Sequence, residues 1–309
     1  AERGMEMFKK EYLDPAMVEI AQQIESRAAN YAYLNTNNVI GALGTNPTSM
    51  ATYSGARARL VQNACPAGEK HMVIPPDMHQ SISTAVSTVF NPTGVIASAF
   101  NTGKLGSGAG FNSWDESVSL YSHTAGTWTG TVETSSGSQS GSSIALTATT
   151  GDTFKAGDVV TFAGVNNVNP VTRRSTGALK QFVILQDVTA AASAATITIS
   201  PAIVGPGSQY QNVDSLPANG ADLTLMPGTT SPNGKSGIQG LALHRDAFAL
   251  VAVPLEVPKA VEMGVAKRDQ SSGISVRFAR TGIEATVLVA GLLLGAAWGG
   301  YATWRRSWL

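Results

Sequence analysis

The runs Ser143-Ile144-Ala145-Leu146-Thr147-Ala148-Thr149 and Ala195-Thr196-Ile197-Thr198-Ile199-Ser200 decide the fold class of this chain. In both runs polar and apolar residues alternate with a period of two, which is typical of strands that bury one face. They belong to a stretch, from about residue 126 to residue 226, in which charge is sparse and Thr, Ser, Val, Ile, Ala and Gly predominate. Asn219-Gly220 and several Gly/Ser clusters supply turns. The stretch therefore predicts a β module.

The segments on either side of this β module have a different pattern. Asp14 followed by Pro15 is typical of a helix N-cap and first helical position. Met17, Ile20 and Ile24 then recur at helical spacing, which predicts an amphipathic helix from Asp14 to about residue 33. This order predicts a β module inserted into a mixed α/β host. Further helices are predicted at residues 50–63 and 77–90, and strand-like segments at 73–76, 241–253 and 273–278.

Composition excludes several classes of protein. The 309 residues are enough for roughly two domains. Because 21 basic residues balance 21 acidic ones, no basic excess indicates nucleic-acid binding. Charged residues make up 14%, against about 25% in an average soluble domain. Sparse charge fits a subunit that buries much of itself against neighbours, and it fits equally a β protein rich in Thr and Ser.

Cysteine usage and the first residues bear on the cellular compartment. Cys65 is the only cysteine, so no internal disulfide is predicted and a small, partly buried thiol is the favoured interpretation. The beginning of the chain lacks an apolar segment, so no signal peptide is predicted. Both observations fit a reducing cytosol.

Motifs of catalysis or ligand binding are missing from the local sequence. The four histidines form no zinc-binding pattern. The run at 137–141 resembles a nucleophile elbow but has Gln139 at its centre. The glycines at 106–110 lack the Lys-Ser/Thr of a P-loop and are interpreted as a flexible surface loop. Asp152 and Asp158 flank Lys155 in a predicted turn and are interpreted as solvated. We therefore predict no catalytic, cofactor-binding or metal-binding residues and no enzyme.

Several short segments, spread in order from Phe8 to Arg280, carry a resemblance to a known family. They are Phe8–Ala16, Phe90–Gly94, Gly103–Gly106, Ala109–Phe111, Ser122–Gly126, Phe154–Val159, Ala163–Asn166, Asn169–Thr172 and Gly240–Phe248. Read together, they resemble the coat-protein family of short-tailed phages of the P22 type. The first resembles the family's long spine helix and its approach, the fifth the entry into an inserted domain, and the last the return to the host fold.

The resemblance implies an α+β fold of the Hong Kong 97 capsid type with an inserted β-barrel domain. It places the spine-helix part of the peripheral domain at 1–34, part of the axial domain at 35–122, the inserted barrel at 123–230, and the return through both host domains at 231–309. It implies a structural, non-enzymatic subunit of an icosahedral capsid that encloses the viral DNA.

The resemblance also implies partners and a location. The subunit is expected to self-assemble into hexamers and pentamers, with scaffolding, portal and cementing proteins as partners. Packaged DNA is contacted non-specifically at most, and no cofactor is implied. Assembly in the host cytoplasm and residence in the virion capsid are expected. The match departs at both ends: the family has an N-terminal arm and extended loop before the spine helix, and Trp304–Leu309 differs from its usual ending.

Two other classes of protein stay open at this point. Residues Ala285 to Trp304 are twenty in a row without a charge, long enough to span a bilayer, and Arg305-Arg306 follow them. A C-terminally membrane-anchored surface protein is therefore the alternative. Against it, the glycines of this segment also suit close packing in a protein interior. A soluble enzyme whose catalytic groups converge from distant positions is the third possibility.

Overall fold

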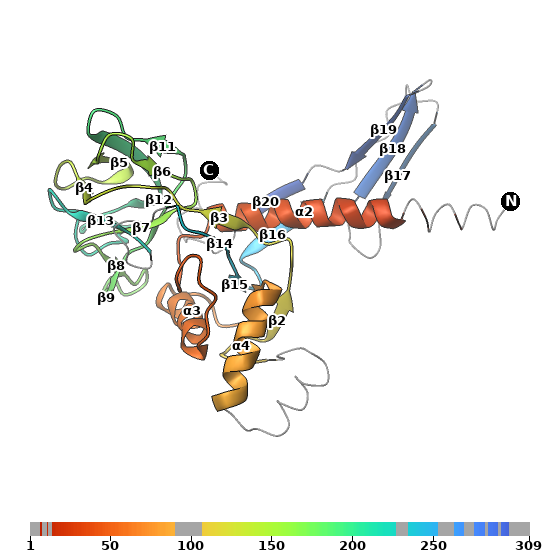
Figure 1. Cartoon of the computed structure of the whole chain (residues 1–309), viewed down its shortest axis with the longest axis horizontal. Helices are drawn as coiled ribbons and strands as arrows, with labels where there is room; N and C mark the ends of the chain where they lie inside the picture. Colours follow the sequence, from red (N-terminus) through yellow and green to blue (C-terminus); the bar gives the residue numbers. More distant parts are fainter. Residues whose placement is uncertain are drawn as a thin grey trace.

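The computed structural model describes residues 14–89, 107–226, 234–252, 263–268, 275–281, 284–289 and 292–296, together with Met7 and Glu11. A closed barrel lies at one end of a long helix, and a three-stranded sheet lies near the other end (Figure 1). Two shorter helices and a small mixed sheet lie beside the barrel end of the long helix (Figure 1). The predicted mixture of a β module and an α/β host is confirmed.

The long helix α2 (Asp14–Leu34) matches the helix predicted from residue 14 to about 33. Among the α2 residues whose burial the structure describes, the buried hydrophobic ones are Ile24, Ala29, Ala32 and Tyr33, all in the C-terminal half. These four residues recur at spacings that put them on neighbouring faces of a helix. The helix therefore attaches to the rest of the molecule by its C-terminal half.

The β module forms a closed barrel in which each neighbouring pair of strands is hydrogen-bonded. The strand order around it is β10-β12-β5-β4-β13-β7. The bounds are β4 (Val132–Thr134), β5 (Gly141–Thr147), β7 (Val159–Phe162), β10 (Phe182–Ile184), β12 (Ala194–Ile203) and β13 (Asp222–Leu225). Closure removes the exposed strand edges that an open sheet of this size would have.

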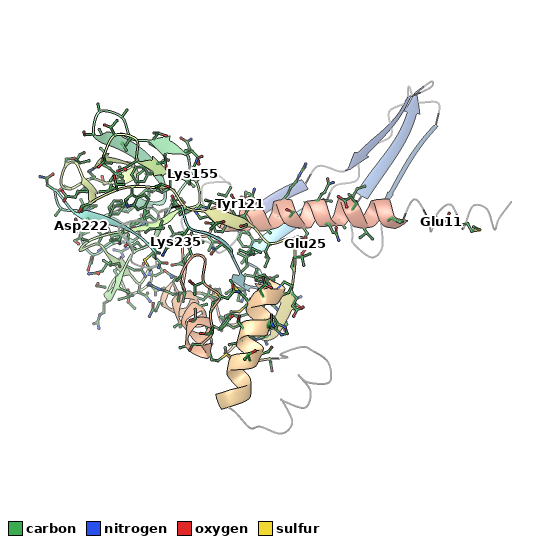
Figure 2. The ribbon with its side chains drawn as sticks, viewed as in Figure 1. Glu11, Glu25, Tyr121, Lys155, Asp222 and Lys235 are labelled. Carbon is green, nitrogen blue, oxygen red and sulfur yellow. The ribbon has the colours of Figure 1, made fainter. Side chains whose placement is uncertain are left out.

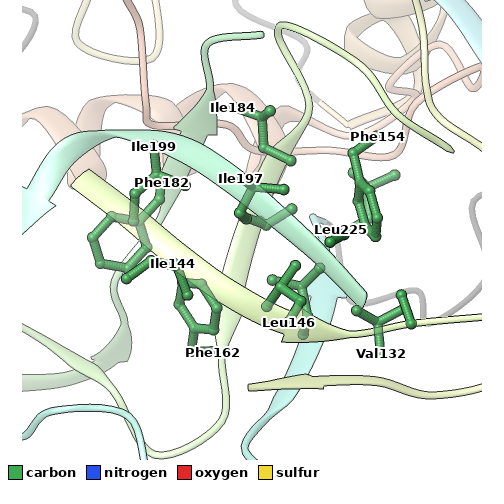
Figure 3. Packing of buried hydrophobic residues seen from close by; sticks show 14 of the residues in the cluster. Val132, Ile144, Leu146, Phe154, Phe162, Phe182, Ile184, Ile197, Ile199 and Leu225 are labelled. Carbon is green, nitrogen blue, oxygen red and sulfur yellow. The ribbon is translucent and has the colours of Figure 1, made fainter. Parts of the chain in front are cut away.

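The two alternating runs form the longest contact in the barrel. In the antiparallel register of β5 and β12, Ile144 is the partner of Ile197. Ile144, Leu146, Ile197 and Ile199 are all buried, while Ser143 and Thr147 are exposed. The period-two pattern therefore correctly identified the inward face, which Figure 3 shows packed together.

Two short strand pairs lie between the barrel strands in the sequence, and one of them contributes Phe154 to the barrel core. There the ring of Trp128 stacks on that of Phe154 at a centroid distance of 5.1 Å. The pairs are β6 (Thr153–Phe154) with β11 (Val188–Thr189), and β8 (Asn166–Val168) with β9 (Ser175–Leu179).

A small mixed sheet and two helices form the second core. Strand β1 (Lys70–Ile74) runs parallel to β2 (Ser113–Glu116) and antiparallel to β15 (Leu241–His244). Helices α3 (Met50–Gln62) and α4 (Pro76–Val89) pack with this sheet around a shared core. The buried residues of this core are Tyr53, Met72, Ile74, Ile82, Phe111 and Trp114. Both helices were predicted, and each matches its expected range within the described residues.

The chain enters and leaves the barrel region through one pair of strands. Strand β3 (Ser122–Thr124) lies just before the barrel and β14 (Ser236–Ile238) just after it. The two are antiparallel partners, with His123 opposite Gly237. The barrel is therefore an insertion whose two connections lie side by side.

The C-terminal part adds two further sheets. Strand β16 (Phe248–Ala252) pairs with β20 (Leu292–Ala296), which also contacts α2. The three-stranded sheet consists of β17 (Met263–Arg268), β18 (Ser275–Thr281) and β19 (Glu284–Val289). In the ranges that the structure describes, no helix is both long and apolar enough to cross a membrane.

Several sequence expectations need correction or restriction. The strand-like segment predicted at 73–76 lies earlier in the chain, because β1 ends at Ile74 and α4 begins at Pro76. The strand-like segment at 241–253 is two strands, because a turn at Arg245-Asp246 separates β15 from β16. The glycine-rich loop is described only from Ser107 onward. There it is a tight turn packed on α3, because Gly108 and Phe111 form an isolated bridge and Gly110 lies against the Arg57 side chain. The remainder of that loop, and residues 90–94, lie outside the described ranges.

Candidate interface between the inserted barrel and the host fold

The polar junction between the barrel and the host fold is the best candidate for a functional site. Within the described residues, no three His, Cys, Asp or Glu side chains are placed to hold a metal ion. Buried polar side chains instead gather where the end of α2, the segment after it and α3 meet the barrel. The candidate site is therefore this junction of buried polar side chains.

The first connection is made by Tyr33 in the last turn of α2. Its hydroxyl donates a hydrogen bond to the carbonyl oxygen of Gly157 at 2.7 Å. Gly157 has a φ of +95°, and its N–H donates to the carbonyl of Ile184 in β10. The ring of Tyr121 lies 4.7 Å from that of Tyr33, where the C-terminal end of α2 meets the barrel (Figure 2).

Burial dominates the electrostatics of Tyr33. Desolvation raises the pKa of its hydroxyl well above the ordinary value, and the nearby Asp158 and Tyr121 raise it further. The hydroxyl therefore stays protonated and remains a donor to Gly157.

The second connection is a buried pair of His123 and Asp158. The imidazole Nε2 of His123, in β3, lies 2.7 Å from Oδ1 of Asp158. The other carboxylate oxygen accepts hydrogen bonds from the backbone N–H groups of Gly126 at 3.1 Å and Lys155 at 2.8 Å. One carboxylate thus ties the incoming strand to the turn that precedes β7.

The interpretation of Asp152 and Asp158 as solvated is wrong. Both are buried, with exposed fractions of 4% and 1%. Asp152 accepts from the backbone N–H groups of Thr129 at 3.0 Å and Thr149 at 2.9 Å. Each carboxylate satisfies backbone donors in loops that have no ladder partner, which is why burial is tolerated.

The third connection is made by Gln181, directly before β10. Its side-chain Oε1 accepts from the N–H of Val39 at 2.8 Å, and its Nε2 donates to the carbonyl of Val39 at 3.0 Å. Asn37 donates from Nδ2 to the Gln181 carbonyl at 3.1 Å. The buried amide of Gln181 thus pairs with the backbone of Val39 as a neighbouring strand would.

The fourth connection is a row of hydrogen-bonded side chains that consists of Lys180 and three asparagine amides. Lys180 donates from Nζ to Oδ1 of Asn167 at 2.9 Å, and Asn167 donates to Oδ1 of Asn63 at 3.3 Å. Asn63 is the C-cap of α3 and also donates to Oδ1 of Asn38 at 3.2 Å. The row joins the barrel to α3 and to the segment after α2.

A crevice of about 1620 Å³ runs along this junction. Its lining includes Tyr33, Arg59, Asn63, Arg173 and Lys180. The junction is therefore bridged at separate points by directional hydrogen bonds and is open between them.

No residue of this junction was singled out as a functional site from the sequence. One signal in the sequence was the polar pair Lys180-Gln181, which directly precedes an apolar strand. In the structure both residues of this pair are buried. Cys65 is partly buried, as expected, and lines the same crevice.

Comparison with known proteins gives three findings. A sequence model of the family described as "P22 coat protein - gene protein 5" matches residues 4–290 of the chain. A search of curated proteins gave no match. Among solved structures, the chain is similar to the "CUS-3 coat protein I-domain", with 29% identity and a TM-score of 0.22. That similarity covers 34% of this chain and 94% of the I-domain chain.

Proposed function

The chain belongs to the P22 coat protein family of structural subunits that self-assemble into tailed-phage capsids, and from this premise we propose that its barrel is held rigidly by the rest of the coat subunit. The observation that carries the proposal is the junction itself. Four separate hydrogen-bonded connections join one barrel to α2, β3, the segment after α2 and α3. A module held at several points moves with the host fold and transmits load to it.

For the host fold we propose the Hong Kong 97-like arrangement. The long helix α2 with the three-stranded sheet β17–β19 corresponds to a peripheral domain, and the sheet β15-β1-β2 with α3 and α4 to an axial domain. The proposed division is 1–34, 35–122, 123–230 and 231–309. The closed barrel falls inside the third of these segments, and its paired entry and exit strands support an insertion there.

The proposed assembly consists of hexamers and pentamers in an icosahedral shell that encloses the viral DNA. Scaffolding, portal and cementing proteins are the proposed partners, and the host cytoplasm is the proposed place of assembly. A net charge of zero supports only non-specific contact with packaged DNA. The role is structural, and we assign no catalytic residue to it.

The membrane-anchored alternative is not favoured. Of the uncharged segment Ala285–Trp304, the described residues form most of β19 and all of β20, and β20 is paired with β16. Residues 297–304 lie outside the described ranges.

Particle formation tests the capsid assignment. The full chain, coexpressed with its scaffolding partner, is examined by sedimentation and negative-stain microscopy. Closed shells are expected. Subunits that stay monomeric with and without the partner would contradict the assignment.

Spin-label distances test the rigid mounting. Labels are placed on cysteines at Val18 of α2 and Val171 of the barrel, both exposed, with Cys65 replaced by serine. A narrow distance distribution is expected. It should broaden in Gln181→Ala, which loses both side-chain bonds to Val39. Gln139→Ala is the matched control, because Gln139 makes the same kind of side-chain bonds to Ala145 within the barrel. A broad distribution in the unmodified junction would refute rigid mounting.

A further inference from the structure

Lys180 is a buried cation that has no acidic partner among the residues the structure describes. Its residue is 9% exposed, and its ammonium makes one described hydrogen bond, to Asn167. An ammonium has three N–H donors, so two remain. In the part of the chain that the structure describes, no carboxylate lies within the 4.0 Å that defines an ion pair with Lys180.

Arg59 is a second cation in the same situation. It lies in the last turn of α3 and is half-buried. Over the described ranges its guanidinium forms no ion pair and no side-chain hydrogen bond, although it carries five N–H donors. Both Arg59 and Lys180 line the crevice at the junction.

The two cations act on one another. Burial and, as the smaller cause, the charge of Arg59 together lower the pKa of Lys180 to about 8. Burial also lowers the pKa of Arg59. Buried charges are normally paired, because an isolated ion loses its hydration without compensation. The subunit thus carries two neighbouring cations that no carboxylate among the described residues neutralises.

The acids that line the crevice do not fill this role. Asp158 is already bound to His123 and to two backbone N–H groups. Asp77 lies in the first turn of α4 and pairs with neither cation. Arg59 and Lys180 therefore line a crevice in which the described residues offer them no acceptor of opposite charge.

We propose that Arg59 and Lys180 form an oxyanion-binding site in the crevice between α3 and the barrel. A guanidinium fork and an ammonium together match the geometry of phosphate, sulfate or carboxylate oxygens. A bound oxyanion links α3 to Lys180, two residues before β10, and so it adds a fifth connection between the host fold and the barrel. The oxyanion is either a free inorganic anion or a carboxylate of a second copy of this chain. The site stands on the two side chains alone and does not depend on the capsid role.

Sulfate is the probe, because its charge is constant across the relevant pH range. Binding to the full-length free subunit is measured by calorimetry, and the unfolding midpoint is compared in sulfate and in chloride at equal ionic strength. Saturable binding with a raised midpoint is expected. Arg59→Gln and Lys180→Met should each abolish it. Arg245→Gln is the matched control, since Arg245 is an exposed cation that pairs with Glu69, and neither residue lines the crevice.

Folding of the variants does not confound this test. Arg59 is half-buried at the crevice, so its replacement leaves both cores intact. Lys180→Met keeps the volume and removes a buried charge, but it also removes the hydrogen bond to Asn167, so the unfolding midpoint of each variant in chloride is the reference for its response to sulfate.

The pH dependence identifies Lys180 as a ligand. Sulfate affinity should fall roughly tenfold per pH unit above the pKa of Lys180, because only the protonated ammonium attracts the anion. Arg59 stays charged over this range, and it is the only charged group found to shift the pKa of Lys180 within the described residues. Affinity that is flat from pH 7 to 10 would overturn the assignment.

Assembled particles distinguish the two sources of the oxyanion. If a second copy supplies a carboxylate, particles should not respond to sulfate although free subunits do. If the anion is free in solution, particles and free subunits should respond alike. Free subunits that bind sulfate no better than chloride, or variants at Arg59 and Lys180 that both keep the parent's response, would refute the site.

Discussion

Replacing Tyr33 with phenylalanine removes one hydroxyl and leaves the ring in place. The hydroxyl is the described donor to the buried carbonyl of Gly157, at 2.7 Å. A buried acceptor that loses its partner costs about 1–3 kcal/mol, because it is not rehydrated. The free energy of unfolding of the subunit should therefore fall by about 1–3 kcal/mol, measured by urea denaturation of the full chain.

Tyr121→Phe is the matched control for this substitution. Its ring lies 4.7 Å from that of Tyr33, yet its hydroxyl makes no hydrogen bond to any residue in the described ranges. A change within about 0.5 kcal/mol is expected for such a residue. If Tyr33→Phe loses no more stability than Tyr121→Phe, the bond to Gly157 does not hold the helix to the barrel.

Three further predictions concern the same region. Burial raises the pKa of Tyr33 above the usual value of about 10, so the stabilisation from its protonated hydroxyl is complete below pH 10 and is lost as pH rises further. Above pH 10 the free energy of unfolding should therefore fall more steeply with pH in the parent than in Tyr33→Phe. In urea denaturation, Gly157→Ala should lower the free energy of unfolding by about 1–3 kcal/mol more than Gly151→Ala does. Both glycines have a φ of +95°, but a Cβ at position 157 would lie 2.5 Å from the Tyr33 ring, whereas one at position 151 would meet nothing within 4 Å. Equal losses would refute the close packing. Residues 123–226 expressed alone should give a β-type circular dichroism spectrum and a cooperative melt, because the buried barrel core lies wholly within residues 125–225; a random-coil spectrum would contradict this.

The elements were largely predictable because their patterns are local. Alternation in the run 143–149 identified the buried face of β5, and Asp14-Pro15 identified the start of α2. Both signals depend on residues within a few positions of one another. The break between β15 and β16 was missed, although the adjacent charges Arg245 and Asp246 marked it.

The junction was not predictable because its partners are distant in sequence. Asp158 follows a glycine in a polar turn, a pattern that normally indicates a solvated residue. Its burial is explained by His123, 35 residues earlier, and by backbone donors from two loops. Similarly, the amide of Gln181 is satisfied by Val39, 142 residues away, which no local pattern reveals.

The pairing of β1 with β15 has a consequence for synthesis on the ribosome. Strand β1 lies before the barrel in the sequence and its partner β15 lies after it, and the acceptor of Tyr33 is 124 residues further along the chain. At about 5–20 residues per second, the acceptor follows Tyr33 by roughly 6–25 s. During that interval the C-terminal half of α2 and one edge of β1 lack their partners. The nascent chain therefore passes through a stage in which host surfaces await a barrel that is still being made, and slower translation lengthens their exposure to aggregation.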